Sequence, residues 1–304
     1  MIQSPPGGAG SVVTVAGDVA DAVHLRELMQ VSAGSLRVPI GLVDGPVAQL
    51  PELASVQWIG TRPRPDSGSS GTAWRHGTAV AGILHAQRAS PAVGVCPQSP
   101  LLVRPVFTDV STHQARPGVA VENAGQAIVD CVDAGARLVN LSVAPARLSP
   151  GAEHALEEAL DYATRKGVLV VAAAGNHGTV ASSALTRHTS VLPVVACDHA
   201  GRPTRHSNLG PSLGRRGLRA PGEALSSLDP NGDLIGFSGT SAATPVVTGA
   251  AALLWSLAPR ATPGQLKTVL LGPERRKSVT PPLLNAGEAC RALTHAQDTR
   301  REHA

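Results

Sequence analysis

Five short apolar runs divide this chain, and helical stretches alternate with them. The runs cover Val38–Val43, Leu101–Phe107, Leu138–Ser142, Val168–Ala173 and Val191–Ala196. The helical stretches cover His76–Ala86, Ala120–Ala134, Pro150–Arg165, Ser241–Ser256 and Pro263–Leu271. Strands that alternate with helices favour an α/β fold with a mainly parallel central sheet and helices on both faces. We expect a single domain, because 304 residues is an ordinary size for such a fold.

The composition narrows the class of protein. Aromatic residues make up only 2% of the chain, so the core must be built mainly from Ala, Val, Leu and Ile. The longest unbroken apolar run, Val168–Ala174, is far shorter than the ~20 residues of a membrane-spanning helix. The net charge of +4 is modest, and the basic clusters at Arg215–Arg219 and Arg275–Lys277 contain no aromatic residue. We therefore expect neither membrane nor nucleic-acid partners, and these clusters are typical of solvated loops, with an acidic-peptide surface as the alternative.

The amino-terminal segment and the cysteines bear on location. Residues 1–11 contain no basic stretch followed by an apolar segment, so no secretory signal is evident. Four widely spaced cysteines, Cys96, Cys131, Cys197 and Cys290, show no metal-ligand spacing and are expected to be free thiols rather than disulfides. We expect a cytoplasmic protein with no cofactor.

One segment is typical of a nucleophilic serine. Ser241 lies within Gly239–Pro245, directly before the small and apolar run Val246–Leu254. Glycine and small residues let the backbone turn sharply beside this hydroxyl and let a substrate chain approach it. Taken alone, the segment fits an ordinary helix N-cap equally well. A serine hydroxyl is a weak nucleophile, so a base, a carboxylate and an oxyanion donor must also be present.

Three upstream residues can fill these roles. Asp44 follows an apolar run that reads as a buried strand, and Gly45-Pro46 ends that strand. Asp44 is therefore expected at the carboxyl end of the strand, where sites form in α/β sheets. A turn-forming Asp fits equally well. His76 opens a stretch of small residues suited to a tightly packed helix, as the candidate base. Asn176 follows a strand in a glycine-flanked turn, where an Asn is usually only a turn residue. Each signal is weak alone, but four motifs at strand ends and helix starts are jointly improbable by chance.

The order Asp44, His76, Asn176, Ser241 resembles that of the subtilisin-like serine proteases (peptidase family S8). The resemblance spans roughly residues 36 to 292 and implies a three-layer subtilisin-like fold. It also implies a serine endopeptidase that works through an acyl-enzyme, with Asn176 as an oxyanion donor. A narrower resemblance lies in Asp44–Val47, which replaces the usual Asp-Ser/Thr-Gly, in Val191–Asp198 and in the segment from Ser207 to Gly222. These segments look like the proteases of cyanobactin maturation, which implies proteolytic processing of a ribosomal precursor peptide.

The resemblance also implies where a peptide binds. Leu138–Val143 is similar to the strand that lies alongside substrate in the family. The expected substrate-binding residues are Asn140, Ser142, Val143, Ala144, Gly175, His177 and Thr240. For His177 a solvent-facing turn residue is an equal alternative. Relatives carry a glycine where this chain has Val143-Ala144-Pro145, so we expect a narrowed pocket that prefers a small or compact P1 residue.

Two other functions share parts of this pattern. A transamidating peptide macrocyclase would use the same four residues but exclude water, and its relatives carry an insertion for which Gly45–Arg75 has little room. A peptide-binding pseudoprotease would be expected to lack at least one of the four. Hydrolysis is therefore favoured.

The expected boundaries complete the sequence prediction. Residues 1–35 form a lead-in with no evident signal or full prodomain, with a helix expected at Asp18–Met29. Residues 36–293 form the catalytic domain, and residues 294–304 a disordered tail. No calcium site is expected after the His76 helix, because His85–Pro91 contains no carboxylate and one Arg. The sequence leaves the oligomeric state open.

Overall fold

The computed structural model describes residues 14–63, 71–107, 123–143, 148–273 and 278–302. A seven-stranded sheet forms its centre, and every neighbouring pair of strands is parallel. In spatial order the strands are β2 (Gln57–Trp58), β3 (Leu101–Pro105), β1 (Ile40–Asp44), β4 (Leu138–Leu141), β5 (Leu169–Ala173), β6 (Leu192–Cys197) and β7 (Leu218–Pro221). The predicted α/β class with a mainly parallel sheet is confirmed.

The strands read as unbroken apolar runs because both faces of the sheet are covered. In β5, Leu169 and Val171 join one hydrophobic cluster, whereas Val170 and Ala172 join the other. Alternate side chains of one strand thus enter two separate cores. Both cores are built mainly from Ala, Val, Leu and Ile, as expected for a chain with few aromatic residues.

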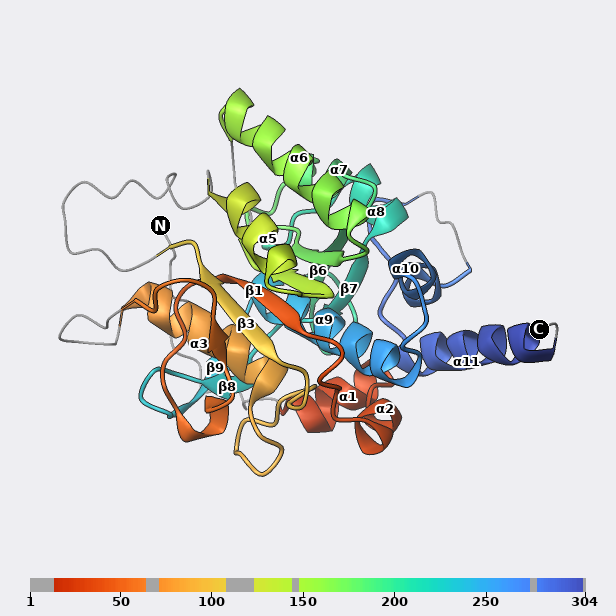
Figure 1. Cartoon of the computed structure of the whole chain (residues 1–304), viewed down its shortest axis with the longest axis horizontal. Helices are drawn as coiled ribbons and strands as arrows, with labels where there is room; N and C mark the ends of the chain where they lie inside the picture. Colours follow the sequence, from red (N-terminus) through yellow and green to blue (C-terminus); the bar gives the residue numbers. More distant parts are fainter. Residues whose placement is uncertain (1–13, 64–70, 108–122, 144–147, 274–277, 303–304) are drawn as a thin grey trace.

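Helices cover both faces of the sheet (Figure 1). One face carries α5 (Ala124–Asp133), α6 (Pro150–Arg165) and α7 (Ala184–Arg187). The other carries α3 (Thr72–His85) and α9 (Thr240–Leu257), with α10 (Pro263–Leu271) and α11 (Ala286–Glu302) outside them. The short helix α8 (Pro211–Arg216) packs beside β6, and η2 (Pro51–Leu53) packs against α3.

Helix α9 runs through the core. Each residue from Thr240 to Trp255 is buried, and the helix contacts β4, β5, β6, β7 and α3. Within the described chain it is the one helix long and apolar enough to cross a bilayer, but 89% of that window is buried inside the protein. This burial is that of a core helix of a folded domain.

The structure corrects several predicted boundaries. The lead-in is not one helix over Asp18–Met29 but three short pieces, η1 (Val15–Val19), α1 (Ala20–Ala22) and α2 (Arg26–Val31). The break falls at His24, whose φ is +52°. At the other end α11 continues through Glu302, so the expected tail from residue 294 is wrong as a structural boundary. That stretch lacks an apolar stripe but is rich in Ala, Gln, Glu and Arg, which favour helix by themselves.

Edge elements were missed entirely. Strand β2 has two residues and β7 contains an arginine, so neither has the pattern of a buried strand. The antiparallel hairpin of β8 (Leu225–Leu228) and β9 (Leu234–Phe237) stands outside the main sheet, against α3. Its outer strand β9 is half exposed. All four cysteines are free, and Cys96, Cys131 and Cys197 are buried.

Candidate active site

Asp44 and His76 meet at the carboxyl edge of the sheet. Asp44 is the last residue of β1 and is fully buried, and His76 lies early in α3. The distance between His76 Nδ1 and Asp44 Oδ1 is 2.6 Å. The backbone N–H of Gly45 also donates to Asp44 Oδ1, at 2.6 Å. Because a carboxylate can only accept, Nδ1 carries the proton, which leaves Nε2 as the acceptor of the neutral ring.

Two glycines permit this close approach. A Cβ on Gly77 would lie 2.4 Å from the carbonyl oxygen of Gly45 and 2.5 Å from that of Pro46. A Cβ on Gly45 would lie 2.2 Å from the carbonyl oxygen of Ala73. The start of α3 and the chain after Asp44 therefore touch backbone to backbone. This contact explains physically why Asp-Gly and His-Gly occur here.

Aromatic edges enclose the imidazole. The ring of Phe107, just after β3, lies 5.7 Å from the His76 ring, and the ring of Phe237, at the end of β9, lies 5.3 Å away. Both pairs are T-shaped, with interplanar angles of 67° and 83°. They are the only two phenylalanines in the chain. The two rings limit rotation of the imidazole and keep water from most of it, so that 21% of the His76 side chain is exposed.

The surroundings of His76 act on its pKa in opposite directions. Burial lowers the pKa, because it disfavours the imidazolium, whereas the charge of Asp44 and its hydrogen bond raise it. The net result is a raised pKa. His85, nine residues further along the same helix, differs. Burial lowers the pKa of His85 to about 4, and its Nε2 lies 2.7 Å from Ser55 Oγ, so it is a neutral core residue.

Ser241 reaches the same edge from α9. It is the second residue of that helix and is 7% exposed. Its Oγ donates to the carbonyl oxygen of Ser142, just beyond β4, at 3.3 Å. Because the first N–H groups of a helix have no intrahelical acceptor, the backbone N–H of Ser241 is available to an anion.

Asn176 lies in the turn after β5 and is exposed. Its Oδ1 accepts from the backbone N–H of Thr240 at 2.9 Å and from the Thr240 hydroxyl at 3.1 Å. These bonds occupy the oxygen of the side-chain amide, whereas its Nδ2 group has no acceptor within the described part of the chain. Thr240, which bonds Asn176, directly precedes Ser241. The side-chain amide of Asn176 therefore lies near the backbone N–H of Ser241.

Two of the expected substrate-binding residues, Asn140 and Thr240, are wrong as substrate contacts because their side chains are fully buried. Asn140 is fully buried, because β4 pairs with β1 on one side and β5 on the other, so no peptide strand can add beside it. Its amide donates to Ser142 Oγ and accepts from Thr248, both at 2.9 Å. Thr240 is also fully buried, and its hydroxyl serves Asn176 and the N–H of Gly175.

The other expected residues lie at or beside the edge. Ser142 and Val143 follow the last paired residue of β4 and are 6% and 8% exposed. Gly175 is buried with a φ of +101°, a conformation that favours glycine. His177 is exposed, and its backbone N–H donates to Asn208 Oδ1. Ala144 lies outside the described residues.

An arginine, Arg88, lies in the loop after α3, the segment in which no calcium site is expected. The guanidinium of Arg88 donates to the carbonyl oxygens of Met29, Ser32 (2.6 Å) and Val95 (3.2 Å). Three backbone oxygens thus converge on one internal cation. No group of three or more His, Cys, Asp or Glu side chains suited to a metal occurs among the residues the structure describes.

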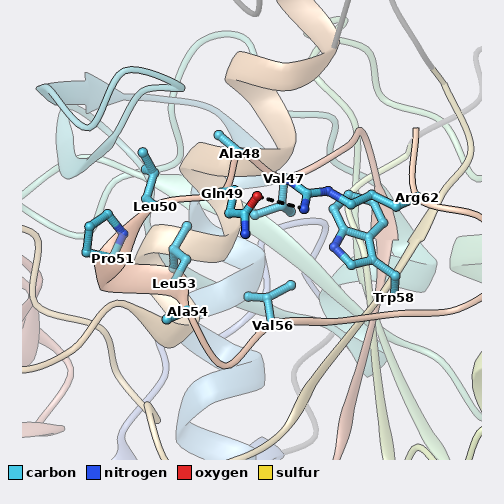
Figure 2. Close-up of a pocket in the computed structure, with 10 residues that line it drawn as sticks. All are labelled: Val47, Ala48, Gln49, Leu50, Pro51, Leu53, Ala54, Val56, Trp58 and Arg62. Carbon is cyan, nitrogen blue, oxygen red and sulfur yellow. Dashed lines mark hydrogen bonds between the residues drawn. The ribbon is translucent and has the colours of Figure 1, made fainter. Parts of the chain in front are cut away.

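A separate pocket of about 390 Å³ is formed by the chain between Asp44 and His76 (Figure 2). Apolar side chains line most of it: Val47, Ala48, Leu50, Pro51, Leu53, Ala54, Val56 and Trp58. At its rim Arg62 stacks over the Trp58 ring at 5.5 Å and donates to Gln49 Oε1 at 2.9 Å. The pocket contains none of the four residues described above, so it is not the site of chemistry.

Several functional contacts carried no sequence signal that we used. Phe107, Phe237 and Asn208 all support the site from distant segments. The rarity of phenylalanine in this chain was visible, but its location beside a histidine was not. Asn208 stood within a segment used for the family resemblance and was given no role.

Comparison with known proteins gives a consistent result. A family model described as the subtilase family matches residues 49–281. An alkaline protease of Alkalihalobacillus alcalophilus is 32% identical over 258 residues, which cover 84% of this chain and 60% of that protein. Subtilisin Savinase of Lederbergia lenta is 32% identical over 256 residues, covering 83% and 84%. The chain thus spans about 60% of the length of the first curated relatives that it matches.

Solved structures add a narrower likeness. The prenylagaramide maturation protease PagA is 31% identical, with a TM-score of 0.74 over 88% of this chain and 98% of that one. The protease domain of PatA is 30% identical, with a TM-score of 0.75 over 86% and 97%. The PatG macrocyclase in complex with peptide has a TM-score of 0.76 over 93% and 98%, but its 20% identity shows a shared fold alone.

Proposed function

This chain belongs to the subtilase family, and we propose that it is a serine endopeptidase that processes a ribosomally made precursor peptide. One observation carries the proposal: the 2.6 Å contact of Asp44 and His76 lies at the same sheet edge as Ser241 and Asn176. A peptide-binding pseudoprotease would not need all four. Their arrangement supports acyl transfer rather than binding alone.

Chemistry begins when the Ser241 hydroxyl exchanges its bond to the Ser142 carbonyl for one to His76 Nε2. His76 removes the proton as Oγ attacks the peptide carbonyl, and Asp44 stabilises the imidazolium that forms. The negative charge on the carbonyl oxygen is received by Asn176 Nδ2 and the backbone N–H of Ser241. His76 then gives its proton to the leaving amine. Water attacks the acyl-enzyme in the same way and restores Ser241.

The substrate class is proposed from two observations. Ser142 and Val143 lie just past the last paired residue of β4, where an extended peptide can find backbone partners. PagA and the PatA domain, both maturation proteases, resemble the chain over nearly their whole length. We expect a compact P1 residue, since this chain has Val143-Ala144-Pro145 where relatives carry a glycine, and an added methyl group would narrow the pocket. A peptide library in which bulky aromatic P1 residues are cleaved best would contradict this.

Hydrolysis is favoured over macrocyclisation. The described part of the chain between Asp44 and His76 holds the single turn η2, the two-residue strand β2 and the first residues of α3. A water-excluding helical cover is not found among them. Mass spectrometry of a reacted precursor peptide distinguishes the two reactions, because hydrolysis gives a linear product and cyclisation gives a product lighter by one water.

The activity itself is tested with a fluorophosphonate probe and a peptide substrate. We expect the protein to be labelled and to hydrolyse peptide, and Ser241→Ala to abolish both. Labelling that persists in Ser241→Ala would contradict the assignment of the nucleophile.

We also propose a cytoplasmic location. The support is the free state of all four cysteines, three of them buried, which is compatible with a reducing compartment. Cell fractionation with an antibody to the protein tests this, and recovery in the secreted fraction would contradict it.

A further inference from the structure

The oxyanion donor Asn176 stands on an exposed turn, yet its amide must be held to within a fraction of an ångström to act. Thr240 fixes the oxygen end of its side chain, as described above. That contact does not fix the backbone of the turn itself. Glycines on both sides, Gly175 (φ +101°) and Gly178 (φ +64°), make this backbone intrinsically adaptable.

One side chain bonds to the turn on both sides of Asn176. Asn208 Oδ1 accepts from the backbone N–H groups of His177 at 3.0 Å and Thr179 at 3.3 Å, and from the Thr179 hydroxyl at 3.1 Å. Its Nδ2 donates to the carbonyl oxygen of Ala174 at 3.0 Å. Its own backbone N–H donates to the carbonyl oxygen of Gly175 at 2.9 Å. Hydrogen bonds to Asn208, rather than bonds within the turn, therefore hold the turn in shape.

The chemistry of these contacts requires an amide. Three donors converge on one end of the Asn208 side chain and a carbonyl oxygen faces the other. An aspartate in this position would turn an oxygen toward the carbonyl of Ala174, and an alanine would leave all of these groups unpaired.

Asn208 is itself anchored to the sheet. The hydroxyl of its neighbour Ser207, which is 4% exposed, bonds both the N–H and the carbonyl oxygen of Ala196 in β6, each at 3.1 Å. On the other side, Leu209 exchanges backbone hydrogen bonds with Thr179 and Ala181 at 2.9 Å. The segment around Asn208 thus connects the turn to a rigid strand.

We propose that Asn208 is a positioning residue for the oxyanion hole, which acts on the reaction through Asn176. The inference rests on the proposed function. Because Asn208 holds the turn and does not itself reach the nucleophile through any contact in the structure, its loss lowers the turnover number, kcat, more than it raises KM. Its effect also depends on Asn176 being present.

A double-mutant cycle on the full chain tests this. Four proteins, wild type, Asn208→Ala, Asn176→Ala and the double variant, are compared for kcat and KM on one peptide substrate. We expect Asn208→Ala to lower kcat about 10-fold to 100-fold, somewhat less than the 10²–10³-fold typical of losing an oxyanion donor. In the Asn176→Ala background the same change lowers kcat less than about 3-fold, because the two act as a unit.

Two controls separate positioning from folding. Asn208→Asp keeps the acceptor and loses the donor to Ala174, and it is expected to fall between wild type and Asn208→Ala. Asn231→Ala removes an exposed turn residue whose amide contacts only Asp229, and it leaves kcat unchanged. Circular dichroism melting of each variant shows whether it is folded at the assay temperature.

The outcomes are distinct. An unchanged kcat in Asn208→Ala, or an equal loss in both backgrounds, overturns the positioning role. A wild-type protein that neither hydrolyses peptide nor reacts with fluorophosphonate overturns the proposed function instead.

Discussion

The hydroxyl of Ser241 donates its hydrogen bond to the carbonyl oxygen of Ser142, at 3.3 Å. Ser142 stands just past the last paired residue of β4, at the carboxyl edge of the sheet. The proposed nucleophile is therefore protonated at rest, and a backbone carbonyl at this edge holds it. In the proposed mechanism this hydroxyl leaves the Ser142 carbonyl and turns toward His76 Nε2.

The acid limb of activity should lie above the ordinary range for histidine. His76 must be neutral to act as a base, and its pKa is raised, so imidazolium persists to higher pH than in a free histidine. We expect the acid half-point of kcat/KM above pH 6.5, the ordinary value for histidine. Removing the charge with Asp44→Asn leaves burial as the main influence, so the half-point moves down, and kcat falls about 10⁴-fold. A pH profile whose half-point does not move in Asp44→Asn would contradict this account.

The backbone contact beside His76 should not tolerate a methyl group. Gly77→Ala brings a Cβ to 2.4 Å and 2.5 Å from two carbonyl oxygens, which must move apart. We expect a loss of about 1–3 kcal/mol in the free energy of unfolding, together with a lower kcat, because α3 shifts from Asp44. Gly151→Ala is the matched control, since nothing lies within 4 Å of its added Cβ. Urea unfolding measures the free energy of unfolding of the two variants. Equal stability of Gly77→Ala and Gly151→Ala would argue against the close backbone approach.

The two phenylalanines should tune the base. Phe237→Leu admits water to the imidazole, and because burial lowers the pKa of His76, less burial raises it further. We expect the acid limb to move to higher pH and kcat to fall as the ring gains freedom. Tyr162→Leu removes an aromatic ring on α6 whose hydroxyl donates to Asp133, and it should leave the profile in place. A profile unchanged in Phe237→Leu would show that the ring contact has no electrostatic consequence.

Arg88 should act as a structural cation. Arg88→Met leaves the carbonyl oxygens of Met29, Ser32 and Val95 without their donor, at a cost of about 2–3 kcal/mol in the free energy of unfolding. We expect a lower melting temperature for this variant and no change in wild type on addition of a chelator. Arg202→Met, which removes a largely exposed guanidinium, serves as control. A wild-type protein that loses several degrees in chelator would mean that a metal contributes to stability.

Local chemistry made much of the site predictable. Asp44, His76, Asn176 and Ser241 each stand where an apolar run ends or a small-residue helix begins, and these transitions are written in neighbouring residues. The parallel sheet followed from the same alternation of runs and helices. Glycine at positions 45 and 77 was visible as a signal before its reason, a backbone contact, could be known.

Long-range pairing was not predictable in the same way. Asn140 was expected to meet substrate, but β4 lies between β1 and β5, and the order of strands in a sheet is no property of any one segment. Likewise Asn208 meets the turn of Asn176 from a segment about thirty residues away in sequence. Nothing in the composition of either segment specifies that contact.

The burial of α9 has a consequence for synthesis of the protein. Ser241 lies in the last quarter of the 304 residues, on a helix that is packed between the sheet and α3. A chain still on the ribosome carries Asp44, His76 and Asn176 long before it carries the nucleophile. Chains that end before Ser241 therefore lack the proposed nucleophile, so the proposed activity cannot arise until this late segment has been made and has packed into the core.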